Sequence, residues 1–113
     1  MKIDLNKEEE LYDYSDNIQE IVDLDNHISI PNHPVHIVMD DKELMVDVDI
    51  DIIYHVHTEH DEYGYIRFKE AEKQDVTVLM NEVYDLDGAE LELSHDEIID
   101  IEYKIQDKIK NLK

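Results

Sequence analysis

Residues 44–56 read LMVDVDIDIIYHV, a run in which apolar and polar side chains alternate with a period of two. This period is typical of a β-strand, because successive side chains of a strand point to opposite faces of a sheet. The apolar positions are Leu44, Val46, Val48, Ile50, Ile52, Tyr54 and Val56. The polar positions are Asp47, Asp49, Asp51, His55 and His57. The pattern predicts a strand with one face in a core and the other in water, as antiparallel sheets permit.

The flanking segments predict the rest of a sheet. Residues 25–34 lose the periodicity and contain Pro31 and Pro34, which predicts a connecting loop before a short strand at 35–39. The elements expected after the long strand are a hairpin connection at 57–62, a return through 63–69, a polar link at 70–74, a strand at 76–84, a turn at Asp87-Gly88 and a short strand at 89–93.

Two helices are expected outside the sheet. Residues 7–24 place apolar side chains three and four apart, which predicts one helix, or two if Ser15 caps a shorter second one. Ser94 followed by Glu97 fits a capping box, and the segment it opens has Ile98, Ile101, Ile105, Ile109 and Leu112 on one face. The predicted fold class is α+β: a single domain over residues 1–113, with an antiparallel sheet of four to five strands, an N-terminal helix and a C-terminal amphipathic helix.

The composition is strongly acidic. The chain has 31 Asp and Glu against 10 Lys and Arg, a formal charge of −21, far outside the magnitude of about 2–8 that suits a small domain. Charge of this sign disfavours direct binding to nucleic acid or to anionic lipid. An apolar content of 42% with only two glycines and two prolines indicates a folded chain. The absence of cysteine excludes disulfides and thiolate metal sites. The start of the chain does not resemble a signal peptide, so we expect a cytoplasmic protein.

The acidic positions of the long strand are the first candidate site. Alternate residues of a strand lie about 6.6–6.8 Å apart, so three aspartates form a regular row of negative charge that a basic groove could bind in place of phosphates. A solvated sheet face is the alternative explanation. Exposed tyrosines among carboxylates are good contact residues for a partner protein. The predicted partner-binding residues are Asp47, Asp49, Asp51, Glu43, Tyr63, Tyr65, Glu90 and Glu92.

The second candidate is a histidine-rich segment. His55, His57, Glu59 and His60 resemble the His-x-His-x-Asp-His motif of metallo-β-lactamase-fold hydrolases, which implies a metal site on His55, His57 and His60. The resemblance covers six residues, and exposed histidines at a hairpin end are the alternative, so no cofactor is predicted. The aspartate row does not form a calcium loop, because Ile52 stands where an EF-hand requires glycine. No glycine-rich phosphate loop is present, and we expect no enzymatic activity.

A short, cysteine-free and strongly acidic chain with a periodic core resembles the DNA-mimic proteins of bacteriophages that block restriction enzymes or CRISPR effectors. The resemblance implies an inhibitor or decoy that evades host defence by binding a basic nucleic-acid-binding protein in the host cytoplasm. A homodimer is left open as the oligomeric state. Two alternatives stay open. One is a small metal-binding protein or enzyme that uses the histidine segment. The other is a phage structural or adaptor protein, because residues from the acidic strand to the C-terminal helix also resemble small accessory proteins of tailed phages.

Overall fold

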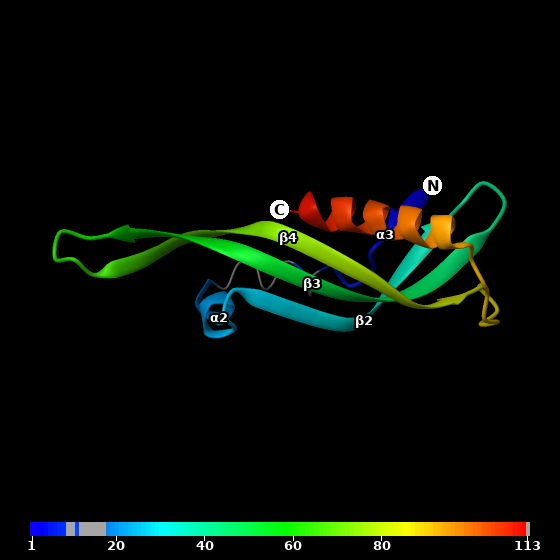
Figure 1. Ribbon diagram of the computed structural model, residues 1–113, viewed down its shortest axis with the longest axis horizontal. Helices are drawn as coiled ribbons and strands as arrows, with labels where there is room; N and C mark the ends of the chain where they lie inside the picture. The colour runs from blue at the N-terminus through cyan, green and yellow to red at the C-terminus, as the bar shows by residue number, and fades with distance from the viewer. Residues whose placement is uncertain (9–10, 12–17, 113) are drawn as a thin grey trace.

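The fold is built on a four-stranded antiparallel sheet with the order β1-β2-β3-β4 (Figure 1). The computed structural model describes residues 1–8, 11 and 18–112. Its elements are β1 (Lys2–Asp4), α2 (Ile18–Asp23), β2 (His27–Val38), β3 (Glu43–His60), β4 (Ile66–Tyr84) and α3 (His95–Lys110). The predicted α+β class, with an antiparallel sheet, an N-terminal helix and a C-terminal helix, is confirmed. The short strand expected at 89–93 is reduced to an isolated bridge between Tyr84 and Glu90.

The core lies on one face of the sheet, and β3 supplies its central row. The apolar positions of β3 from Leu44 to Tyr54 are buried, as the alternation predicted. Their register partners continue the same face, with Ile28 opposite Ile52 on β2 and Val78 opposite Ile50 on β4. Burial of each such aliphatic side chain contributes about 1.5–3 kcal/mol. The buried residues of α3 complete this core, and they are Ile101, Ile105 and Ile109.

Helix α3 begins as the sequence predicted and connects both edges of the sheet. The Ser94 side chain accepts from the Glu97 N–H, and the Glu97 side chain accepts from the Ser94 N–H, which completes the capping box. On the β4 edge, α3 side chains accept hydrogen bonds from the backbone N–H groups of Val78 and Met80. On the β1 edge, Lys108 donates to the carbonyl of Ile3. The helix therefore occupies part of the edge of each outer strand, where the backbone groups would otherwise be open to pairing with another chain.

The loop predicted at residues 25–34 is wrong, because β2 begins at His27. Pro31 is accommodated by a register shift in β2, and Pro34 by its place in an unpaired stretch of the strand edge. The register with β3 shifts between Ile30 and His33, around Pro31 and the positive φ of Asn32. Pro34 lies in the part of β2 that has no second neighbour, since β1 pairs only with residues 36–38, and an edge strand tolerates the missing N–H.

Strands β3 and β4 form one long hairpin rather than the shorter elements predicted. Strand β3 continues to His60, and β4 runs without interruption through residues 70–74, so both the hairpin connection at 57–62 and the polar link at 70–74 are wrong. The turn lies at 61–65, where Asp61 accepts from the N–H groups of Tyr63 and Tyr65, both at 2.9 Å. Residues 70–74 look like a linker because they lie at the margin of the core, where Ala71 is the one apolar residue that packs against it.

The hairpin makes the molecule elongated. Its extents are 61 × 21 × 19 Å, and Figure 1 shows the β3–β4 end projecting away from the helices. We call residues 55–72, which carry this projection, the arm. Helix α2 lies within the segment 7–24 that was predicted to be helical, but the choice between one helix and two falls on residues outside the described part. Within the described residues, no helix has the length and apolar character needed to cross a membrane.

Candidate acidic binding face

The solvent-facing side of the sheet gathers carboxylates from two neighbouring strands. On β3 the row consists of Glu43, Asp47, Asp49 and Asp51, and the register places Glu82 and Asp75 of β4 on the same side, next to Asp47 and Ile53. We call these six carboxylates the acidic face. The predicted placement of the aspartate row on one strand face is therefore confirmed, and β4 widens it.

Hydrogen bonds from neighbouring strands hold the row in place. Asp49 Oδ1 accepts from the Asn32 N–H at 3.0 Å and from Asn81 Nδ2 at 2.8 Å. Asp51 Oδ1 lies 2.5 Å from Ser29 Oγ and 3.0 Å from His27 Nε2. These bonds keep the two carboxylates fixed on the sheet surface.

The described contacts of Asp49 and Asp51 all involve one oxygen of each carboxylate. Among the side chains that the structure describes, none bonds to Oδ2 of either residue. A carboxylate offers about four acceptor sites on its two oxygens. Both aspartates are thus anchored through Oδ1 and keep Oδ2 for an external donor.

The electrostatics at Asp51 favour its ionised form. The hydrogen bond from Ser29 is the main cause that lowers the pKa of Asp51 below its ordinary value of 3.8, with His27 contributing in the same direction and desolvation opposing both. The described ion pairs to the acidic face come from histidines: His27 to Asp51 at 3.0 Å and His36 to Glu43 at 3.2 Å. Among the described side chains, no lysine or arginine pairs with these carboxylates, so their charge is not neutralised by a permanent cation.

The sequence analysis missed Glu82 and Asp75 of this face, and it missed three residues that hydrogen-bond to the aspartate row. Asn81 lies on β4, while Asn32 and Ser29 come from the segment predicted as a loop. Their roles depend on cross-strand register, which a single strand's periodicity does not contain. The turn-favouring side chain of Asn32 is the one local signal, since asparagine tolerates the positive φ of 51° found there.

The remaining predicted binding residues lie at the two ends of the molecule. Tyr63 and Tyr65 are in the turn at the end of the arm, 79% and 71% exposed. Glu90 and Glu92 lie after the Asp87-Gly88 turn and line a shallow hollow together with Glu82. The structure therefore joins Glu90 and Glu92 to the margin of the acidic face and separates the tyrosines from it.

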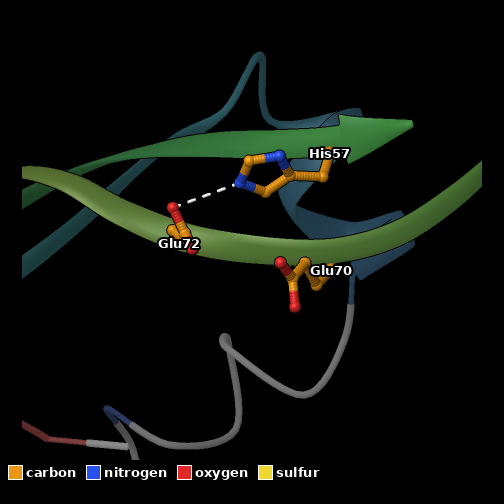
Figure 2. Close-up of side chains that lie close together, drawn as sticks. All are labelled: His57, Glu70 and Glu72. Atoms are coloured by element: carbon orange, nitrogen blue, oxygen red, sulfur yellow. Dashed lines mark ion pairs between the residues drawn. The ribbon is translucent and has the colours of Figure 1, made fainter. Parts of the chain in front are cut away.

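The histidines are arranged differently from the sequence motif. His55 and His57 share a strand face, with ring centroids 4.6 Å apart in an edge-to-face contact. The group of described side chains that come together as potential metal ligands is His57 with Glu70 and Glu72, without His55 or His60 (Figure 2). No protein family, curated protein or solved structure matches the chain.

Proposed function

We propose that this protein is an acidic, DNA-mimicking inhibitor that binds the nucleic-acid-binding surface of a host defence protein, such as a CRISPR effector or a restriction enzyme. The observation that supports the proposal best is the acidic face itself. Asp49 and Asp51 are held by hydrogen bonds through one oxygen each, and the pKa of Asp51 is lowered. Among the described side chains, no lysine or arginine pairs with any carboxylate of the face. The proposed role is binding, without enzymatic activity, in the cytoplasm of the host cell.

The length and charge of the molecule are of the right order for such a mimic. Duplex DNA carries one negative charge per about 1.7 Å of axis, so a length of 61 Å corresponds to about 36 phosphates. This chain carries a net −21 over the same length. The elongated molecule therefore presents to a DNA-binding groove a negative charge per unit length comparable to that of duplex DNA.

The hydrogen bonds beneath the row also favour binding. A flexible acidic tail loses conformational freedom when it binds, whereas carboxylates anchored on a sheet have already lost it. Asp49 and Asp51 are anchored in this way from β2 and β4. Long-range attraction between such a face and a basic groove accelerates association and weakens with salt.

The test uses the immobilised chain at low salt. Proteins retained from a bacterial lysate are identified, and duplex DNA is then used to elute them. We expect nucleic-acid-binding proteins that DNA displaces. If the retained proteins are phage or host structural proteins that DNA fails to displace, the adaptor alternative is favoured and the mimicry proposal is wrong.

A matched pair of variants then locates the surface on a purified partner. D47N/D49N/D51N removes three charges from the acidic face while the amide oxygens can still accept the internal hydrogen bonds. We expect a loss of affinity of about 100- to 1,000-fold at low salt, since three lost charged contacts at about 1–1.5 kcal/mol each amount to about 3–4.5 kcal/mol.

The control removes three charges elsewhere. D40N/D41N/D107N changes exposed carboxylates in the β2–β3 turn and on α3, so net charge changes equally. We expect the fold-loss of affinity in the control to be less than about a tenth of the fold-loss in D47N/D49N/D51N. Equal losses would show that total charge, rather than the acidic face, drives binding.

A further inference from the structure

The arm contains a group of side chains that the DNA-mimicry proposal does not use. His57 is on β3, and Glu70 and Glu72 are on β4, where register pairs His57 with Glu70 and His55 with Glu72. Figure 2 shows the His57 ring extending from β3 toward β4, with an ion pair to Glu72 and with Glu70 further along β4. One ligand atom from each residue lies within 4.8 Å of the other two.

The ring of His57 is the feature that favours a role as a metal ligand. Its Nε2 atom is buried although 38% of the side chain is exposed, and it lies 3.1 Å from Glu72 Oε2. The two atoms form an ion pair by distance, yet among the described residues Nε2 has no hydrogen-bond partner of acceptable geometry. A buried ring nitrogen normally has a hydrogen-bond partner or a metal ion.

We propose that His57, Glu70 and Glu72 bind a divalent transition-metal ion, Zn²⁺ in the first place. One imidazole and two carboxylates form a mixed nitrogen and oxygen donor set of the kind that zinc accepts from three protein ligands, with water at the fourth position. Calcium requires six to eight oxygen ligands, and magnesium binds few imidazoles, so both fit this set poorly.

The geometry requires only a small adjustment. Zinc–ligand bonds of about 2.0–2.2 Å bring tetrahedral ligand atoms to within about 3.4 Å of each other. His57 Nε2 and Glu72 Oε2 are already 3.1 Å apart. Because all the ligand atoms lie within 4.8 Å of one another, the remaining approach is at most about 1.4 Å, which rotation of the exposed Glu70 side chain can supply. The sheet backbone does not have to move.

A bound ion would join the two strands of the arm. An isolated two-stranded ribbon is only marginally stable in water. In the described part of the arm, Val56 and Ala71 are the side chains that pack against the core, and both are only partly buried. The ion would also offset the repulsion between Glu70 and Glu72, which lie on the same strand face. The site therefore gives the projecting end of the molecule a metal-dependent rigidity.

The experiment measures Zn²⁺ binding by calorimetry on the untagged chain, with Mg²⁺ and Ca²⁺ as competitors. We expect one Zn²⁺ per chain, not displaced by millimolar Mg²⁺ or Ca²⁺. H57Q and E72Q each remove one ligand, and we expect the Kd to rise by about tenfold or more, since even outer-shell partners of a metal cost that much. Far-UV circular dichroism of both variants checks that the sheet is retained.

The matched controls are H60Q and E62Q, which change a histidine and a glutamate of the arm outside the proposed site. Their Kd for Zn²⁺ is expected to stay within about twofold of the native value. Hydrogen exchange supplies an independent readout, because Zn²⁺ should slow the amides of the arm in the native chain and leave them unchanged in E72Q. Absence of saturable binding, equal weakening in H60Q, or protection outside the arm would overturn the proposal.

Discussion

Asn81 Nδ2 donates a 2.8 Å hydrogen bond to Asp49 Oδ1, and it does so from the extra residue of a β-bulge. The register passes from Asp47 opposite Glu82 to Val48 opposite Met80, which leaves Asn81 without a position of its own in the ladder. A bulge redirects the side chain of its extra residue. Here it places a neutral donor beside a carboxylate of the acidic face.

The first prediction concerns this bond. N81A removes the donor, and we expect the free energy of unfolding to fall by about 0.5–1.5 kcal/mol. N81D places a second negative charge beside Asp49, and we expect it to lower the free energy of unfolding by more than N81A does. Urea unfolding followed by circular dichroism measures both variants.

Gln74 offers a matched control for this pair. It is the extra residue of the neighbouring bulge, between the Ile53–Asp75 and Tyr54–Lys73 pairs, and no described hydrogen bond involves its side chain. Q74A should change the stability by less than about 0.5 kcal/mol. If Q74A and N81A have the same cost, the bulge rather than the bond to Asp49 is responsible.

The second prediction concerns the pH dependence of stability through Asp51. Its pKa is lowered chiefly by Ser29, so the ionised form is favoured by folding. A lowered folded pKa contributes stability that is present above the unfolded value of 3.8 and is lost as pH falls through the folded pKa. S29A should raise the pKa of Asp51 toward 3.8, because it removes the largest cause of the shift.

S29A is therefore expected to be less stable than the native chain between about pH 5 and 7 and to approach it below the folded pKa of Asp51. The difference between the two proteins is the relevant quantity, since protonation of the other carboxylates affects both alike. Carboxyl NMR titration and urea unfolding at several pH values measure it. T77V changes the register partner of Asp51 on β4, which has no described bond to it, and should leave the titration unchanged. A constant deficit for S29A at every pH would contradict the linkage.

Much of the fold can be predicted from the periodicity of apolar residues. The predictions are wrong where a strand is not buried along one face, because burial then imposes no alternation on its sequence. The row from Leu44 to Tyr54 alternates because one face is buried along its whole length. The residues of β4 from 70 to 74 lie at the margin of the core, where Ala71 is only partly buried and Lys73 donates to the Leu112 carbonyl, so one small apolar residue is all that burial demands and the segment resembles a linker. The first part of β2 contains two prolines, and only the bulge and the edge position explain why a strand accepts them.

The candidate sites show the same division. The aspartates of the acidic face belong to one strand, so their common face could be predicted from spacing alone. The partners of His57 could not, because Glu70 and Glu72 reach it through the register of a long hairpin that contains three irregularities. A sequence motif within one strand therefore selected His55 and His60, which are near in sequence, over two glutamates on the neighbouring strand.

The third prediction tests the cover that α3 provides for β4. Glu102 Oε2 accepts from the Met80 N–H at 3.0 Å and Gln106 Oε1 from the Val78 N–H at 3.1 Å. E102A/Q106A leaves these partly buried donors without acceptors, and we expect a loss of about 1–3 kcal/mol for each donor. The exposed edge should also promote self-association, measurable by analytical ultracentrifugation. E102Q keeps an acceptor oxygen and should remain close to the native stability. An E102A/Q106A variant as stable and monodisperse as E102Q would show that the bonds are not needed.

The fourth prediction separates the two kinds of contact that a partner protein could make. Tyr63 and Tyr65 are almost fully exposed at the end of the arm, so Y63S/Y65S should change the unfolding free energy by less than about 0.5 kcal/mol. If the partner covers the length of the molecule, losing these aromatic contacts should raise the dissociation rate. The dependence of affinity on salt should stay the same, because no charge is removed.

D47N/D49N/D51N should behave in the opposite way. Removing three charges from the acidic face slows association and flattens the slope of log affinity against log salt, by about three for contacts of phosphate type. Surface plasmon resonance between about 50 and 200 mM salt measures both rates for both variants. The prediction would be wrong if Y63S/Y65S lost the salt dependence of affinity or if D47N/D49N/D51N kept it. Either result would place the electrostatic contact at the end of the arm instead of on the acidic face. The arm would then be the docking element, because its tyrosines are remote from every carboxylate of the acidic face along the β3–β4 hairpin.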